Sequence, residues 1–217
     1  MPTKHKPKTR RTLATTLKLE QFHGLMSELS DWRTLGLQDA GILGFVKGLR
    51  FSARLIYAIR DHLSSSSYEV DWGHLLTRDG NSCSPECDII IHKRGHVREW
   101  NGTTRPVMNF KFINCKDAVA VISCKSMITS VDKEHKAYIK ALKPYVDKIF
   151  IFAECCEPSA VTRLKRSAQK AGCKGFWYLY ACDKMKQCTI DPEEWDNFLT
   201  TLEKLVVARK RKKIKHG

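Results

Sequence analysis

Two charged residues stand at the ends of stretches that otherwise have the character of apolar strands. Asp88 is followed by three isoleucines, and Lys125 comes directly after the run Ala118-Val-Ala-Val-Ile-Ser-Cys. An ammonium group at the end of a buried strand is costly unless it meets a carboxylate or a phosphate. We expect Asp88 to be the carboxylate that Lys125 meets, so this pair is the first candidate for binding chemistry.

Both stretches resemble motifs of the PD-(D/E)XK nuclease superfamily and look closest to an uncharacterised bacterial branch of it. In that branch a Ser-x-x-Asp-Ile-hydrophobic strand precedes a hydrophobic-Ile-Glu-Val-Lys-Ser strand. The matching stretches here are Ser84-Pro-Glu-Cys-Asp-Ile-Ile-Ile and Val121-Ile-Ser-Cys-Lys-Ser. The resemblance covers roughly residues 41–180 and implies a restriction-endonuclease-like α/β fold, in which helices flank a mixed central sheet.

The resemblance also implies metal-dependent hydrolysis of phosphodiester bonds in DNA. Members of the superfamily hold Mg²⁺ with two carboxylates at the ends of adjacent strands, and Mg²⁺ prefers such oxygen ligands. The metal polarises the scissile phosphate and lowers the pKa of the attacking water, while a lysine stabilises the developing charge. By position, Asp88 matches the metal ligand and Lys125 matches the catalytic lysine.

The sequence departs from the superfamily pattern at Ser123. This serine stands two residues before Lys125, where the second carboxylate belongs. A hydroxyl is neutral and cannot replace the charge of a carboxylate. The helix expected over 41–63 also offers no acid between Gly41 and Arg60. Asp88, Lys125 and Ser123 form the candidate catalytic set, and it is one acid short.

Three interpretations of the missing acid stay open. In the first, the acid has moved, and the candidates are Glu69, Asp71, Glu86 and Glu154. Glu86 is the candidate metal ligand beside Asp88, because residues two apart on a strand share a face. In the second, the site is catalytically silent and only nucleic-acid binding remains. In the third, the resemblance concerns the fold alone, which does not fix function.

The net charge of +15 is concentrated at the two ends of the sequence. Residues 1–11 contribute +5 and residues 209–217 contribute +6, which leaves +4 for residues 12–208. Basic segments favour polyanions through counterion release, so we expect DNA or RNA as a partner. The alternatives are a solubilising tail, an import signal or a polyanion other than nucleic acid. The candidate nucleic-acid-binding residues are Lys4, Lys6, Lys8, Arg10, Arg11, Arg209, Lys210, Arg211, Lys212 and Lys213.

The nine cysteines show no convincing disulfide or metal pattern. The first residues lack the apolar segment of a secretory signal, and no run reaches the length of a membrane span, so we expect a cytoplasmic protein with reduced thiols. A zinc site at Cys83, Cys87, His92 and His96 is disfavoured, because five strand steps would separate Cys87 from His92 by roughly 16 Å. The remaining cysteines are expected to pack mostly as small buried hydrophobes.

Apolar periodicity predicts the elements that position these residues. Helices are expected over 12–31, from Asp39 or Gly41 to Leu63, over 131–142 and 158–171, and from Asp191 onward. Strands are expected over 68–76, 87–92, 107–113, 117–124, 148–154 and 175–181. This order predicts one α/β domain over 12–208 with a mixed sheet, a helical N-terminal lead-in and basic tails at 1–11 and 209–217. Assembly as a homodimer or within a protein complex stays open.

Overall fold

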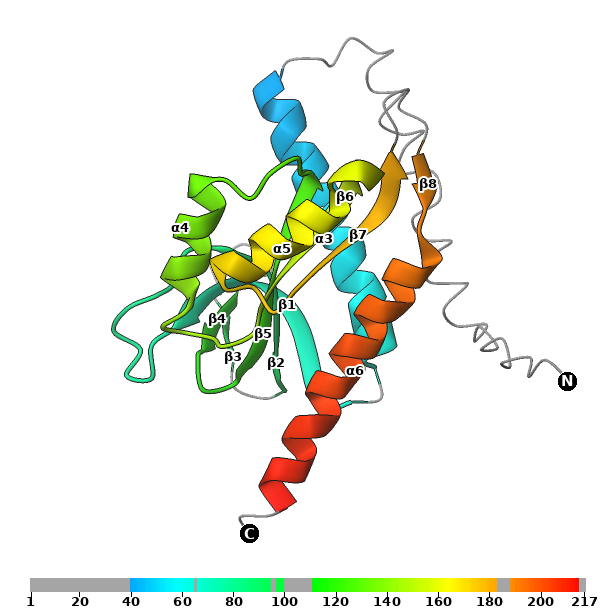
Figure 1. The fold of residues 1–217 in the computed structure, drawn as a ribbon. Helices are drawn as coiled ribbons and strands as arrows, with labels where there is room; N and C mark the ends of the chain where they lie inside the picture. Colours follow the sequence, from blue (N-terminus) through cyan, green and yellow to red (C-terminus); the bar gives the residue numbers. More distant parts are fainter. Residues whose placement is uncertain (1–39, 65, 95–96, 100–110, 183–187, 215–217) are drawn as a thin grey trace, which may run out of the picture. The chain divides into compact units, whose positions relative to one another are not determined.

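The structure is a computed structural model that describes residues 40–64, 66–94, 97–99, 111–182 and 188–214 (Figure 1). Along these residues, helices and strands follow one another in nearly the predicted order. Their bounds are α3 Ala40–His62, β1 Tyr68–Leu76, β2 Cys87–Lys93, β3 Val97–Glu99, β4 Lys111–Asn114, β5 Ala118–Met127, α4 Lys133–Leu142, β6 Ile149–Cys156, the 3₁₀ turn η1 Pro158–Ala160, α5 Val161–Ala171, β7 Gly175–Cys182, β8 Cys188–Ile190 and α6 Pro192–Ile214.

The eight described strands form one sheet in the order β3-β4-β1-β2-β5-β6-β7-β8. β5, β6 and β7 are parallel neighbours, and β1 is parallel to β4. β2 runs antiparallel to both of its neighbours, β1 and β5, and the edge pairs β3–β4 and β7–β8 are also antiparallel. The sheet is therefore mixed and flanked by helices, which confirms the predicted fold class.

One face of the sheet is covered by α4 and α5. Ile139 of α4 and Leu164 of α5 belong to the same buried cluster as Val121 of β5 and Ile151 of β6. Successive residues of a strand point to opposite faces, so Phe152 of β6 lies on the other face.

The opposite face is covered by α3 and α6, which meet around Phe152. The centroid of its ring lies 6.0 Å from that of Phe51 in α3, and 6.0 Å and 4.5 Å from those of Trp195 and Phe198 in α6. All four rings are buried. Since both faces are covered, the central strand β5 is buried from Ala118 to Cys124, which explains why that run is apolar almost throughout.

Local signals in the sequence set several helix ends. Gly172 ends α5 in the left-handed conformation, with φ 103°, which glycine adopts without steric cost. Asp191 caps α6, because its Oδ1 accepts hydrogen bonds from the backbone N–H groups of Glu193 and Glu194, each at 3.1 Å. Both ends fall where the sequence predicts them.

Other parts differ from the sequence-based expectations. The strands β3 and β8 are not predicted, because three residues are too few to show a periodic pattern. β4 begins at Lys111, and residues 107–110 lie outside the described residues, as does the helix expected over 12–31. The backbone of α6 continues to Ile214 and thus includes the basic run 209–213. Among the described helices, none combines the length and apolar character needed to cross a membrane.

Candidate functional site

The antiparallel pairing of β2 with β5 brings Asp88 to Ser123. The register places Ile89 opposite Ile122, so the next pair along the ladder is Asp88 and Ser123. Oδ2 of Asp88 accepts hydrogen bonds from the backbone N–H of Cys124 at 2.8 Å and from Oγ of Ser123 at 3.3 Å. Ser123 therefore interacts directly with Asp88, because its hydroxyl donates a hydrogen bond to the Asp88 carboxylate.

Two further charges act on the Asp88 carboxylate. Burial raises the pKa of Asp88 above its ordinary value, and the Cys124 N–H, the positive charge of Lys125 and the Ser123 hydroxyl only partly oppose this shift. The negative charge of Glu86 raises the pKa of Asp88 further. The charges of Lys125 and Glu86 therefore act on the pKa of Asp88 in opposite directions.

Glu86 is held at this site through its backbone. Its carbonyl oxygen accepts a hydrogen bond of 2.9 Å from the Tyr138 hydroxyl of α4, and the residue itself is exposed. Tyr138 thus ties the segment before β2 to the helix that covers the site. The Glu86 carboxylate remains open to solvent and to a ligand.

The donor set at Asp88 fits a weak magnesium site. Within the described residues, Oδ1 of Asp88 accepts no hydrogen bond, so one oxygen is available to a cation. Mg²⁺ commonly keeps several waters and binds through one or two carboxylates and the phosphates of its substrate. Asp88 and Glu86 meet that minimum. This pair differs from the superfamily pattern, which has a second carboxylate at position 123 on the neighbouring strand, because Glu86 lies in the segment just before β2.

The other three candidates for the displaced acid are engaged in ion pairs elsewhere. Asp71 binds Arg60 at 2.7 Å and His92 at 2.9 Å. Glu69 pairs with Arg94 at 3.3 Å. Glu154 is buried and pairs with Arg50, also at 3.3 Å. Glu86 is therefore the remaining candidate of the four.

The disfavoured zinc site at the start of β2 is not assembled in the described residues. β2 is present as a strand from Cys87 to Lys93, and His92, near its far end, is bonded to Asp71. Cys83 is exposed and Cys87 is buried, while His96 lies outside the described residues. The strand separates the proposed ligands, as its geometry requires.

A basic hollow of about 720 Å³ lies at the opposite end of β5. Five exposed cations and one exposed acid, Asp147, line it, together with apolar residues of β5 and α6. Within the described part of the chain, none of these cations forms an ion pair. The five are Arg78, Lys116, Lys143, Lys148 and Lys204. From here on, this feature is called the basic hollow.

Strand direction explains why these cations meet. β5 and β6 are parallel, so Lys116 before β5 and Lys148 before β6 lie at the same edge of the sheet. The six steps from Val119, which lines the hollow, to Lys125 span roughly 20 Å. The basic hollow is thus separate from the Asp88 site. Sequence reasoning missed it, because the body carries only +4 and the contributing residues are far apart in the chain.

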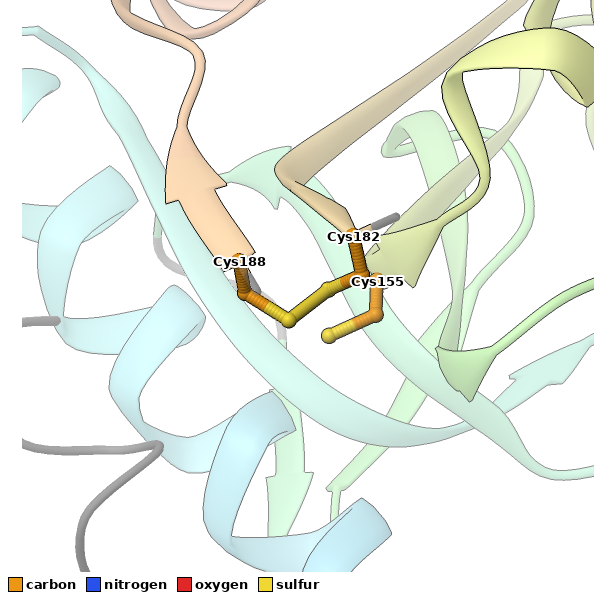
Figure 2. Close-up of side chains that lie close together, drawn as sticks. All are labelled: Cys155, Cys182 and Cys188. Carbon is orange, nitrogen blue, oxygen red and sulfur yellow. A yellow bond between two sulfur atoms is a disulfide. The ribbon is translucent and has the colours of Figure 1, made fainter. Parts of the chain in front are cut away.

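Three cysteines expected to pack as small hydrophobes are instead gathered at the edge formed by β6, β7 and β8 (Figure 2). Cys182 and Cys188 are joined by a disulfide, and Cys155 lies beside them. The expectation of reduced thiols is wrong for Cys182 and Cys188 in this structure, because β8 and its pairing with β7 had not been predicted. Cys155 is buried, as expected, and forms no disulfide in the described part of the chain.

Comparisons with known proteins support the fold. No protein-family profile matches the sequence, and no curated protein matches it. NucC from P. aeruginosa ATCC27853 in its cAAA-bound form is 13% identical and has a TM-score of 0.56, with 90% of this chain and 92% of that chain covered.

Two structures of NucC from E. coli MS115-1, one cAAA-bound and one apo, are similar to this chain to nearly the same degree. The cAAA-bound form is 10% identical with a TM-score of 0.54, covering 91% of this chain and 93% of that one. The apo form is 10% identical with a TM-score of 0.52, covering 90% and 92%. The chain therefore has an α/β fold similar to that of NucC, with helices around a mixed central sheet, while the roles of its site residues stay predictions.

Proposed function

We propose that this chain is a nucleic-acid-binding protein with a PD-(D/E)XK nuclease-like core, and that an atypical centre at Asp88 and Lys125 hydrolyses phosphodiester bonds with Mg²⁺. The observation that carries the proposal is the placement of these two residues on the paired strands β2 and β5, where the positive charge of Lys125 acts to lower the pKa of the Asp88 carboxyl. The fold shared with NucC supports the same reading.

The residues of the centre have distinct roles in this proposal. Asp88, through Oδ1, and Glu86 would hold the divalent cation, which when bound polarises the scissile phosphate and activates a water. Lys125 stabilises the negative charge that develops on the phosphate. Ser123 donates to Oδ2 of Asp88 and so fixes the orientation of the carboxylate.

Nucleic-acid binding draws on the body as well as on the ends of the chain. The basic hollow concentrates five cations against one acid, and a polyphosphate backbone releases counterions when it meets such a surface. The basic run 209–213 continues along α6 beyond Lys204, which lines the hollow. The other basic run, Lys4 to Arg11, lies outside the described residues and remains part of the proposal on sequence grounds.

A second candidate function is a catalytically silent binding module. The observation that favours it is Ser123, which is buried and occupies the place of the second carboxylate. Its hydroxyl and the Cys124 N–H both occupy Oδ2 of Asp88, so a cation would have one oxygen of this residue to bind. Such a module would bind nucleic acid, alone, as a homodimer or within a larger complex, without cutting it.

The two candidates are distinguished by incubating the full chain with DNA and with RNA in Mg²⁺ and in Mn²⁺. The first candidate predicts metal-dependent cleavage that disappears in the chain carrying both Asp88→Ala and Lys125→Ala. Lys133→Ala, an exposed lysine on α4, is the matched control and should retain activity. Cleavage that survives the double substitution contradicts the site, whereas binding without cleavage by the unmodified chain favours the silent module.

A further inference from the structure

Strand register gathers three sulfur atoms on the β6–β7–β8 edge of the sheet. Cys155 of β6 is the register partner of Tyr180 in β7, and residues two apart on a strand share a face, so Cys182 lies on the same face as Cys155. Cys188 of β8 is the direct antiparallel partner of Cys182. The three sulfur atoms all lie within 4.8 Å of one another, and Figure 2 shows them converging from three neighbouring strands.

The three side chains sit in a largely dry place. Cys155 is 5% exposed and Cys182 is 6% exposed, whereas Cys188 is half-buried and gives the cluster its open side. Burial raises the pKa of Cys155 to about 12, so an unassisted thiolate is scarce there at neutral pH. A metal cation supplies the positive charge that makes buried thiolates stable, and thiolate rather than thiol is the ligand.

We propose that Cys155, Cys182 and Cys188, once the Cys182–Cys188 disulfide is reduced, form a three-thiolate binding site for Zn²⁺. Sulfur ligands select Zn²⁺ over hard cations such as Mg²⁺, so this site is chemically distinct from the one at Asp88. The proposal does not rest on the function suggested for the Asp88 centre.

The geometry suits a tetrahedral ion. With Zn–S bonds of about 2.3 Å, two sulfur ligands of one zinc ion are roughly 3.8 Å apart. All three sulfur atoms lie within 4.8 Å of one another, and those of Cys182 and Cys188, which are bonded in the disulfide, would move apart to this spacing after reduction. Three ligands come from three hydrogen-bonded strands, so little chain ordering is needed to form the site. A water molecule would supply the fourth ligand, as in zinc sites with three protein ligands.

Disulfide and metal exclude each other, and the chemistry balances. An added dithiol gives two electrons and two protons to the Cys182–Cys188 bond, which breaks to leave two thiols while the dithiol becomes a disulfide; a phosphine does the same with water and becomes a phosphine oxide. Zn²⁺ then binds the three sulfur atoms as three thiols lose up to three protons to the solvent. The reduced protein should therefore take up zinc more tightly as the pH rises, and the disulfide form should not bind it at this site.

Either crosslink would hold β8 against β7. β8 is an edge strand of three residues, and it leads directly into Asp191, the cap of α6. A disulfide ties β8 to β7 alone, whereas the zinc ion would tie it to β6 as well. The site thus secures the segment that starts α6, the helix that carries the basic run 209–213.

The test is a titration of the reduced, metal-free full chain with Co²⁺, followed by displacement with Zn²⁺. The proposal predicts one tightly bound Co²⁺ per chain, with the thiolate charge-transfer absorption and the visible bands of tetrahedral cobalt. Cys188→Ser and Cys155→Ser should each weaken binding by more than the roughly 10–100-fold typical of losing an outer-shell partner. Cys156→Ser, a buried neighbour on the same strand, is the matched control and should retain the signal.

Several results would overturn the proposal. They are an absence of thiolate–cobalt absorption in the reduced chain, a signal unchanged in both Cys188→Ser and Cys155→Ser, or equal binding by the oxidised chain. Because Cys188 is half-buried, its serine variant should keep the wild-type far-ultraviolet circular dichroism, so a lost signal in that variant reports the ligand rather than unfolding.

Discussion

Restoring a carboxylate at position 123 gives the sharpest test of the Asp88 centre. In the wild type, Oγ of Ser123 lies 3.3 Å from Oδ2 of Asp88. The carboxylate introduced by Ser123→Glu would therefore lie close to the carboxylate of Asp88. Two unit charges about 4 Å apart repel by about 4 kcal/mol at an effective dielectric constant of about 20. Without metal, the variant should be destabilised by up to this amount, with proton uptake by the carboxyl pair relieving part of it.

Ser123→Gln is the matched control, because it has nearly the same shape without the charge. Urea unfolding in a chelator should find the Glu variant less stable than the Gln variant at pH 7. The gap should close as the pH falls, since burial already raises the pKa of Asp88 and protonation of one carboxyl removes the repulsion. Mg²⁺ should close the gap at pH 7 and raise metal-dependent cleavage by the Glu variant above the wild-type level. Equal stability of both variants in chelator, with no response to Mg²⁺, refutes the proposed geometry.

Three other substitutions test the fold around the site. Asp71→Asn leaves the buried His92 without its carboxylate partner and should cost about 3 kcal/mol. Burial raises the pKa of Asp71, but the hydrogen bond and charge of His92 and the charge of Arg60 outweigh it and lower the folded pKa below 3.8. The stability that ionised Asp71 contributes is therefore present above pH 3.8 and is lost as the pH falls through the folded pKa. Urea unfolding of the wild type and the variant at pH 7 and pH 3 measures this contribution. Gly73→Ala, at φ 139°, sets a methyl group against the Lys111 carbonyl and should lower the melting temperature by several degrees; an unchanged value contradicts the close approach of β1 and β4. Phe152→Ala should cost about 3–5 kcal/mol in urea unfolding, and a loss under 1 kcal/mol would deny that its ring joins α3 to α6.

The strands that position the Asp88 site were predictable because their patterns are long and strong. Asp117 to Cys124 is apolar almost throughout, and a buried central strand has that composition. The two motif halves predict Asp88 and Lys125 on adjacent strands, and β2 and β5 are paired in the structure. The hydrogen bond from Ser123 to Asp88 was not predicted. Asp191 is a similarly local signal, since a helix cap is decided within a few residues.

The features that sequence reasoning missed depend on long-range pairing. The cations of the basic hollow come from the turns before β5 and β6 and from α6, and no local pattern joins them. β8 is too short for periodicity, so the meeting of Cys182 with Cys188 was not foreseen. Glu69 and Asp71 were reasonable candidates for the displaced acid until the structure showed their arginine partners.

The most direct test of the central claim, that the folded body binds nucleic acid, is the salt dependence of DNA and RNA binding by fluorescence anisotropy. Each phosphate contact contributes about 0.9 to the slope of log affinity against log salt. Lys116→Gln with Lys148→Gln in the basic hollow should therefore reduce the slope by up to about 1.8. Lys133→Gln with Lys170→Gln, which removes the same charge from exposed sites outside the hollow, should leave it nearly unchanged. Absence of salt-dependent binding in the full chain, or equal slopes for both double variants, contradicts the account.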